Sequence, residues 1–232
     1  MKDYKKEIEF FYNKLKKNDK FALGKFADGE WGAIKGDSFF PANGEWEANG
    51  NHPLFDIARQ ELIESLQYKD SNYYVAICPC YKDTIAFSKQ NQSQITYANI
   101  FVNSNYNFYK ENYIPLYRER DIHLVTHYNT NLDDLPFKVE KFYPIDYNAW
   151  IVNRDLPDQI LEKDFSDKIF LFAAGSFANI LAYKLWKVNK KNTYIDVGST
   201  LNIWTKIERL QRDYYMGNKE LENLSCPCPN FS

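Results

Sequence analysis

The sequence of 232 residues lacks an excess of positive charge, since 29 lysines and arginines stand against 31 aspartates and glutamates, a formal net charge of -2. Non-specific nucleic-acid binding depends on such an excess, so nucleic acid is not an expected partner. No apolar run approaches the roughly 18 residues of a membrane span, and the first residues lack the apolar core of a secretory signal. We therefore expect a cytoplasmic protein without a transmembrane segment, for which a peripheral association with the membrane stays open.

Repeats, low-complexity tracts and linkers rich in proline, glycine or serine are also missing, which predicts a single domain over residues 1–232. The first 20 residues contain a helix, predicted over residues 4–17 from apolar side chains at helical spacing. Residues 36–53 are rich in glycine, asparagine and proline and predict a loop.

Short apolar runs alternate with helical periodicity through the rest of the chain. Strands are predicted at 21–27, 73–77, 100–102, 122–126, 138–143, 168–173 and 193–197, and helices at 54–66, 177–188 and 201–210. Such alternation is typical of parallel strands joined by crossover helices, in a sheet covered on both faces. The expected fold is α/β, a Rossmann-like doubly wound and mainly parallel sheet.

Ligands of doubly wound sheets bind beyond the carboxyl ends of the strands. The predicted strands place there Asp28, Glu30, Cys78, Cys80, Asn103, His127, Gly175, Ser176, Asp196, Gly198 and Ser199. We expect the functional side chains to belong to this set.

Asp28 and Glu30 flank Gly29 directly after the first predicted strand. In an extended segment residues i and i+2 face the same side, so both carboxylates could converge on Mg²⁺ or Mn²⁺ while the glycine admits a ligand close to the backbone. The alternative is the start of a helix, with Asp28 as N-cap and Glu30 favoured by the helix dipole.

Two turns near the C-terminus could hold phosphate or ribose. Gly175 and Ser176 lead into a helix whose free N–H groups suit a phosphate, although Ser176 could simply be the N-cap. Asp196, before Gly198 and Ser199, could accept a ribose hydroxyl or orient a substrate, and it could equally cap the turn that follows.

His127, at the end of a predicted strand, is a candidate for proton transfer or for a hydrogen bond to a substrate, with a structural histidine as the alternative. Two Cys-Pro-Cys triplets, 78–80 and 226–228, space their thiols too closely for a typical zinc site. Stable disulfides are not expected in a cytoplasmic chain, so free loop thiols are predicted.

Three segments together resemble the GT-D fold glycosyltransferases. They are FADGEW at 26–31, which is similar to the Asp-x-Glu signature of that family, LFAAGSFANILAYKLW at 171–186 and TYIDVGST at 193–200. Their order and separation bracket residues from about 21 to 200. The sequence departs from the pattern at Ala27, where many relatives have glycine, and matches it loosely at Ser199 and Thr200.

The resemblance implies transfer of a sugar, expected to be a hexose, from a nucleotide-diphosphate sugar to a glycan acceptor linked to lipid, protein or oligosaccharide. A UDP-sugar is the expected donor, polysaccharide biosynthesis the expected setting, and a homo-oligomer stays open. Mn²⁺ or Mg²⁺ would be held by Asp28 and Glu30. The implied donor-binding residues are Gly29, Asn103, Gly175, Ser176, Gly198 and Ser199, and the implied catalytic residues are Asp28, Glu30, His127 and Asp196.

The acceptor hydroxyl needs a general base, for which His127, Asp196 and Glu45 are candidates in falling preference. Two other classes stay open. One is a Rossmann methyltransferase that uses S-adenosylmethionine, although the glycines are sparse for its first loop. The other is a non-catalytic protein that binds a nucleotide or a sugar in the same cleft.

Overall fold

The computed structural model of the chain describes residues 3–36, 53–78 and 94–206. Most of the predicted loop at 36–53, with Glu45, lies outside the described residues. So do Cys80, the triplet at 226–228 and the end of the helix predicted at 201–210.

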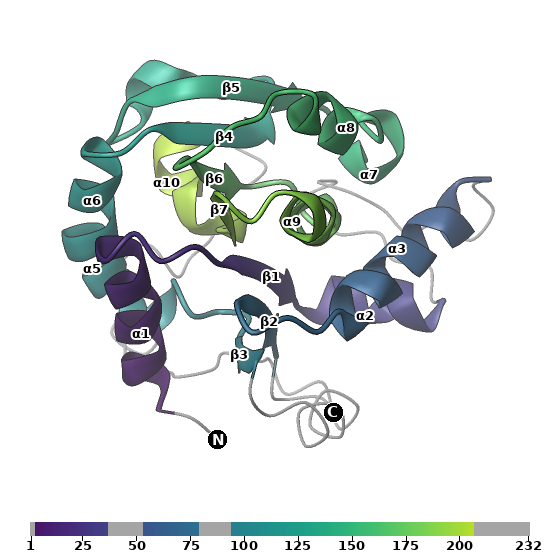
Figure 1. The fold of residues 1–232 in the computed structure, drawn as a ribbon, viewed down its shortest axis with the longest axis horizontal. Helices are drawn as coiled ribbons and strands as arrows, with labels where there is room; N and C mark the ends of the chain where they lie inside the picture. Colours follow the sequence, from purple (N-terminus) through teal and green to yellow (C-terminus); the bar gives the residue numbers. More distant parts are fainter. Residues whose placement is uncertain (1–2, 37–52, 79–93, 207–232) are drawn as a thin grey trace.

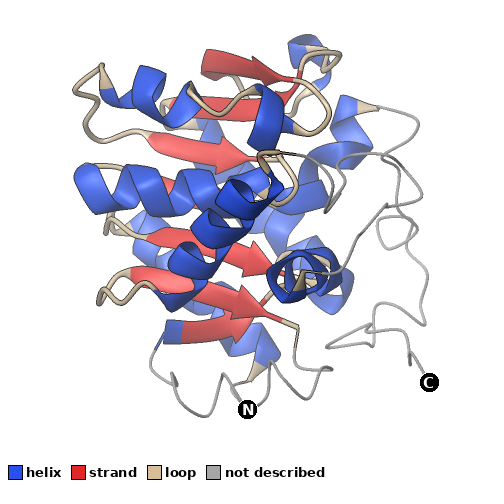
Figure 2. Cartoon of the chain, turned by 90° about the vertical axis from the view of Figure 1, so that its right-hand side faces the viewer, coloured by secondary structure: helices blue, strands red, loops and turns tan. Residues whose placement is uncertain are grey.

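A parallel sheet forms the centre of the molecule (Figure 1). Its strands are β1 (Ala22–Phe26), β2 (Tyr73–Ile77), β3 (Ile95–Tyr97), β4 (Ile122–His127), β5 (Val139–Ile145), β6 (Ile169–Phe172) and β7 (Thr193–Asp196). They lie in the order β3-β2-β1-β7-β6-β4-β5, and every neighbouring pair is parallel. Figure 2 shows the strands as red arrows that point the same way. The predicted doubly wound α/β fold is confirmed.

Helices cover both faces of this sheet. One face carries α2 (Asp28–Lys35), α3 (Phe55–Gln67), α7 (Ala149–Val152), α8 (Leu156–Leu161) and α9 (Phe177–Val188). The other carries α1 (Tyr4–Lys16), η2 (Asn103–Asn105), α5 (Tyr106–Phe108), the π-helical turn η3 (Tyr109–Tyr113), α6 (Ile114–Arg118), η5 (Gly198–Leu201) and α10 (Asn202–Thr205). The 3₁₀ turn η4 (Leu132–Asp134) connects β4 to β5.

The apolar pattern of the strands explains the two cores. Successive strand residues face opposite sides, so Ala22 and Phe26 of β1 pack in the core beneath α9, whereas Leu23 packs in the core beneath α1. The predicted first helix is confirmed as α1, whose Ile8, Phe11 and Leu15 are buried. None of the described helices is long and apolar enough to cross a membrane.

The predicted strand at 100–102 is wrong. These residues form turns, in which the Ile100 N–H donates to Tyr97 and the Val102 N–H to Asn99, and the third strand is β3 at 95–97. Their side chains are apolar because they are buried in the core beneath α1, not because they belong to the sheet. Strand β5 continues through Pro144 to Ile145. Proline is tolerated there because β5 is an edge strand and has a hydrogen-bonded neighbour on one side only.

Candidate functional site

The carboxyl ends of β1 and β7 form the topological switch point of the sheet. The two strands are neighbours, yet β1 leads into α2 and α3 on one face and β7 leads into η5 and α10 on the other. Because the chain leaves these two strands in opposite directions, a crevice is expected between their ends, and this is where ligands of doubly wound sheets bind.

Asp196 joins the two strand ends at this point. One carboxylate oxygen, Oδ2, accepts the backbone N–H of Lys25 at 3.0 Å, and Oδ1 accepts the N–H of Gly198 at 2.8 Å. Asp196 is buried, and this burial raises its pKa to about 6, against the opposing effects of Lys25 and of the two N–H donors. The side chain therefore fixes the end of β1 to the start of η5.

Lys25, the next to last residue of β1, reaches over the turn that Asp196 holds. A Cβ at Gly198 would lie 2.5 Å from the Lys25 Nζ. The amino group therefore lies in the space that a side chain at position 198 would occupy. Gly198 also has a φ of +52°, which favours glycine. Burial lowers the pKa of Lys25, while the carboxylates of Asp196 and Glu30 act in the opposite direction.

Glu30 lies in the first turn of α2, and its Oε2 accepts the backbone N–H of Ala27 at 2.9 Å. Burial, with a further contribution from Asp196, raises its pKa to about 8. Asp28 is exposed at the first position of the same helix. The expected extended segment is therefore wrong: residues 28–30 start a helix because Glu30 caps it, with Ala27 and not Asp28 at the N-cap.

The helical geometry bears on the predicted cation site. Residues i and i+2 of a helix lie about 200° apart around its axis, so Asp28 and Glu30 do not face the same side. The described residues also contain no group of three or more histidine, cysteine, aspartate or glutamate side chains that could hold a metal. The carboxylate pair predicted to hold a cation is therefore not formed. A cation bound at either side chain would take most of its ligands from phosphate oxygens and water.

The first turn of α9 packs onto the end of β1. Asn179 Nδ2 donates to the Lys25 carbonyl at 2.8 Å, and a Cβ at Gly24 would come within 2.9 Å of Asn179 Oδ1. Glycine at position 24 is thus required for the close approach of helix and strand. The backbone of Lys25 is held on both sides, by Asn179 and by Asp196.

The predicted turn at Gly175 and Ser176 leads into α9, and Gly175 has a φ of +53°. The side chain of Ser176 is buried and makes no capping hydrogen bond. The N–H groups of Phe177 and Ala178 donate to the carbonyls of Ala174 and Gly175. These two donors, which the sequence led us to expect free for a phosphate, are therefore already used.

His127 lies at the same edge but away from the switch point, since β6 separates β4 from β7. With strands about 4.8 Å apart, it lies about 10 Å from β7. Its Nδ1 accepts the Asn129 N–H at 3.2 Å, which places the proton of a neutral ring on Nε2. The rings of Tyr128 and Tyr147 pack against it, with centroids at 4.4 and 4.2 Å.

Asn103 starts η2 with a φ of +56°, and neither its amide nitrogen nor its oxygen has a hydrogen bond within the described residues. Its segment reaches the switch point through Tyr106, whose hydroxyl donates to the Thr200 carbonyl at 3.4 Å. Cys78, which follows β2, is disulfide-bonded, so the expectation of a free thiol is wrong there.

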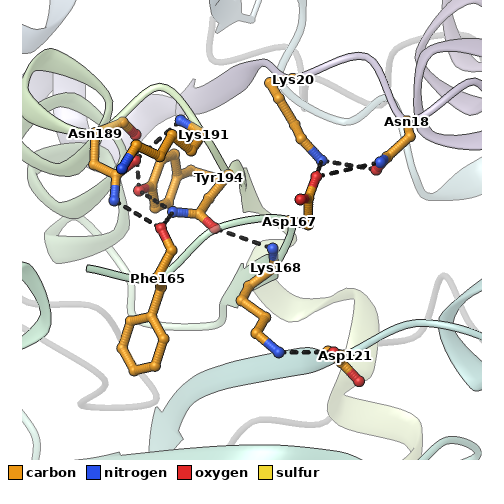
Figure 3. Close-up of polar contacts among 10 residues, drawn as sticks. Asn18, Lys20, Asp121, Phe165, Asp167, Lys168, Asn189, Lys191 and Tyr194 are labelled. Carbon is orange, nitrogen blue, oxygen red and sulfur yellow. Dashed lines mark hydrogen bonds and ion pairs between the residues drawn. The ribbon is translucent and has the colours of Figure 1, made fainter. Parts of the chain in front are cut away.

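A surface hollow of about 500 Å³ lies at the opposite edge, at the amino ends of the strands. It is lined by Lys14, Asp19, Lys20, Asp70, Ser71, Asn72, Trp186 and Lys190. Two of its ammonium groups already have partners. Lys190 pairs with Asp70 at 2.6 Å. Lys20 pairs with Asp167 at 2.8 Å, a contact drawn in Figure 3. The charged groups of the hollow are paired at the surface, whereas those of the switch point are buried. We therefore take the switch point as the candidate site.

Sequence reasoning missed Lys25, Gly24 and Asn179. The available signal was a lysine inside an apolar strand, three residues before Asp28. Asp196, Gly198 and Glu30 were predicted at this edge, and the structure brings them together with Lys25.

Neither the protein-family models nor the curated proteins contain a match to the chain. Among solved structures, one described as the highly conserved domain of unknown function 1792, with a distinct glycosyltransferase fold, is similar with a TM-score of 0.60. A selenomethionine-substituted structure of the domain of unknown function 1792 gives 0.61. Each is 16% identical and covers 87% of this chain and 80% of its own. The chain therefore has the GT-D glycosyltransferase fold, as its three sequence segments predicted.

Proposed function

We propose that the protein is a glycosyltransferase that moves a sugar, a hexose in the first instance, from a nucleotide-diphosphate sugar to a hydroxyl of a glycan acceptor. The observation that carries the proposal is the group of Lys25, Glu30 and Asp196 at the switch point of a glycosyltransferase fold. The likeness of fold favours this class over a methyltransferase.

In the proposed reaction the bond between the anomeric carbon and the diphosphate breaks, and its electron pair leaves with the diphosphate. The acceptor oxygen bonds to that carbon, and its proton passes to a general base or to water. The departing diphosphate carries concentrated negative charge. A Mn²⁺ or Mg²⁺ ion with Asp28 or Glu30 among its ligands would neutralise part of that charge without proton transfer. A UDP-sugar is the first donor to test.

The chain's own residues divide the remaining work. Asp196 positions the Lys25 backbone and the turn at Gly198, because both of its oxygens accept backbone N–H groups. Gly175, which has a positive φ, lets a ligand approach the backbone, and Gly198 leaves the space in which the Lys25 amino group lies. His127, which as a neutral ring donates at Nε2, would hydrogen-bond a substrate oxygen further along the same edge.

The test combines a ligand screen with one substitution. Nucleotide-diphosphate sugars with Mn²⁺ are screened for thermal stabilisation, and those that bind are assayed for transfer and for slow hydrolysis. A ligand at 100 times its dissociation constant adds about 2.7 kcal/mol to the free energy of unfolding, which such a screen detects readily.

Asp28→Asn is expected to lower cation-dependent transfer by orders of magnitude while the protein stays folded. The matched control is Asp56→Asn, because Asp56 is also exposed and in the first turn of a helix, α3. Each variant loses the same helix-dipole interaction, about 0.3–1 kcal/mol. Near-normal transfer by Asp28→Asn would contradict the cation role, and binding without any transfer or hydrolysis would indicate a binding protein.

A further inference from the structure

The side chain of Lys25 lies at the switch point and has no role in the reaction proposed above. Side chains alternate along a strand, so Lys25 faces the same side of the sheet as Leu23, which packs beneath α1. This is the side on which η5 begins, and the position of Nζ over Gly198 agrees with it. The amino group thus lies between the end of β1 and the turn after β7.

The Lys25 Nζ has no hydrogen bond and no ion pair within 4 Å among the described residues, although two carboxylates lie near enough to act on it. Both carboxylates are held by backbone N–H groups: Asp196 by Lys25 and Gly198, and Glu30 by Ala27. They are therefore not free to turn toward the ammonium. Lysines at the opposite edge, by contrast, pair directly, as Lys168 does with Asp121 at 2.7 Å.

A partly buried ammonium without a direct acceptor loses part of its hydration, and a bound anion compensates for that loss. Several backbone donors at this edge are not available to such an anion. The N–H groups of Gly198, Phe177 and Ala178 are already engaged by Asp196 and by two turn carbonyls. The Lys25 ammonium adds a cationic donor next to the N–H groups that begin α2.

We infer that Lys25 binds a phosphate oxygen of the donor's diphosphate, and this inference rests on the proposed glycosyltransferase function. Phosphate suits the position because lysine is a compact point charge with three donors. As the sugar leaves, charge increases on the diphosphate, so the interaction strengthens in the transition state and speeds the chemical step.

The experiment compares UDP, UMP and uridine by calorimetry, with GDP and dTDP in parallel and with EDTA present to remove any contribution from a cation. Lys25→Met is expected to weaken binding of the nucleoside diphosphate by about 10- to 100-fold, the usual range for a lost charge-assisted hydrogen bond. Uridine binding should change by less than about twofold, since it carries no phosphate. Lys25→Arg, which keeps the charge, should retain most of the affinity.

Two further variants separate a specific contact from a general effect. Lys20→Met, at the opposite edge, removes a partly exposed lysine and should leave UDP binding unchanged. Gly198→Ala keeps every charge but places a Cβ where the Lys25 amino group lies, so it should weaken diphosphate binding in the same direction as Lys25→Met. It also tests the inference if Lys25→Met fails to fold.

Diphosphate binding by Lys25→Met and Gly198→Ala within twofold of the unsubstituted protein would overturn the role of Lys25 and leave the glycosyltransferase proposal standing. Failure of the unsubstituted protein to bind any of the three diphosphates, with or without Mn²⁺, would overturn both. In turnover, a loss of kcat together with a higher KM for the donor is expected of Lys25→Met, because the contact strengthens as the diphosphate leaves.

Discussion

Glu30→Gln is expected to make the protein more stable and at the same time inactive. Glu30 is 8% exposed, and burial together with Asp196 raises the pKa of its carboxyl to about 8. The folded protein thus holds this group neutral at pH 7, whereas the unfolded chain ionises it. Glutamine has the same shape and no charge to suppress, and its amide oxygen can still accept the Ala27 N–H that caps α2.

The magnitude follows from the pKa difference. From the ordinary value of 4.5 to pH 7 is about 2.5 pH units, and each unit is about 1.4 kcal/mol, so folding at pH 7 carries a cost of about 3 kcal/mol that the glutamine variant avoids. This figure is an upper value, because replacing the carboxyl also alters the field at Lys25 and Asp196. A gain of about 1–3 kcal/mol corresponds to a rise of about 2–12 °C in Tm for a chain of this length.

The sign of the pH dependence gives a stricter test. A carboxyl whose folded pKa is raised adds no penalty below its unfolded value, so the two proteins should unfold alike below about pH 4.5. The difference between their free energies of unfolding should increase as pH rises from 4.5 to about 8 and stay constant above that. Urea denaturation at several pH values measures it, with Glu119→Gln, an exposed site, as the control expected to stay within about 0.5 kcal/mol.

A glutamine variant less stable than the parent at pH 7, or a difference that is the same at pH 4.5 and pH 8, would refute this account of Glu30. The activity assay is independent of it. If Glu30 serves the cation, the more stable variant loses transfer, which is the usual relation between stability and function at a strained site.

Three further predictions concern the packing of β1 against α9, the pH dependence of stability and the removal of cations. Gly24→Ala should cost about 1–3 kcal/mol because its Cβ would meet Asn179 Oδ1 at 2.9 Å; the double variant with Asn179→Ala should lose less than the sum, and additive losses would contradict the contact. Burial holds the pKa of His123 below its usual range, so stability should fall as pH drops below about 6.5; His123→Phe should show a flatter profile, and parallel curves would count against it. EDTA should abolish transfer and Mn²⁺ restore it, whereas transfer unaffected by EDTA would remove the cation from the mechanism.

Much of the fold could be predicted because the relevant forces are local. The apolar runs at 73–77, 122–126, 168–173 and 193–197 are bounded by turn residues, and their side chains fill the two cores that the helices cover. Strand β3 has only three residues, and the segment 100–102 that follows it is more apolar. The sequence pattern therefore predicts a strand at 100–102 instead of at β3. There the signal for burial was correct, and the inference from burial to strand was wrong.

The helical start at Asp28 was harder to predict for a different reason. A pair of acidic residues around a glycine is compatible with an extended segment and with a helix, and the choice depends on a contact three residues apart, the Ala27 N–H with Glu30. The N-cap residue, Ala27, is not one of the residues that usually mark the start of a helix. The local pattern therefore leaves both conformations open.

Lys25 could not be assigned a role from the sequence because its partners are remote along the chain. Its N–H meets Asp196 across a separation of 171 residues, and the neighbour of its amino group, Gly198, is further still. Within the apolar run of β1 it is only an interruption. In the folded protein two carboxylates are tied to backbone N–H groups, while the Lys25 ammonium has no direct partner among the described residues. Replacing such groups with apolar ones would stabilise a core that binds nothing, and this supports the proposal that Lys25 binds an anion.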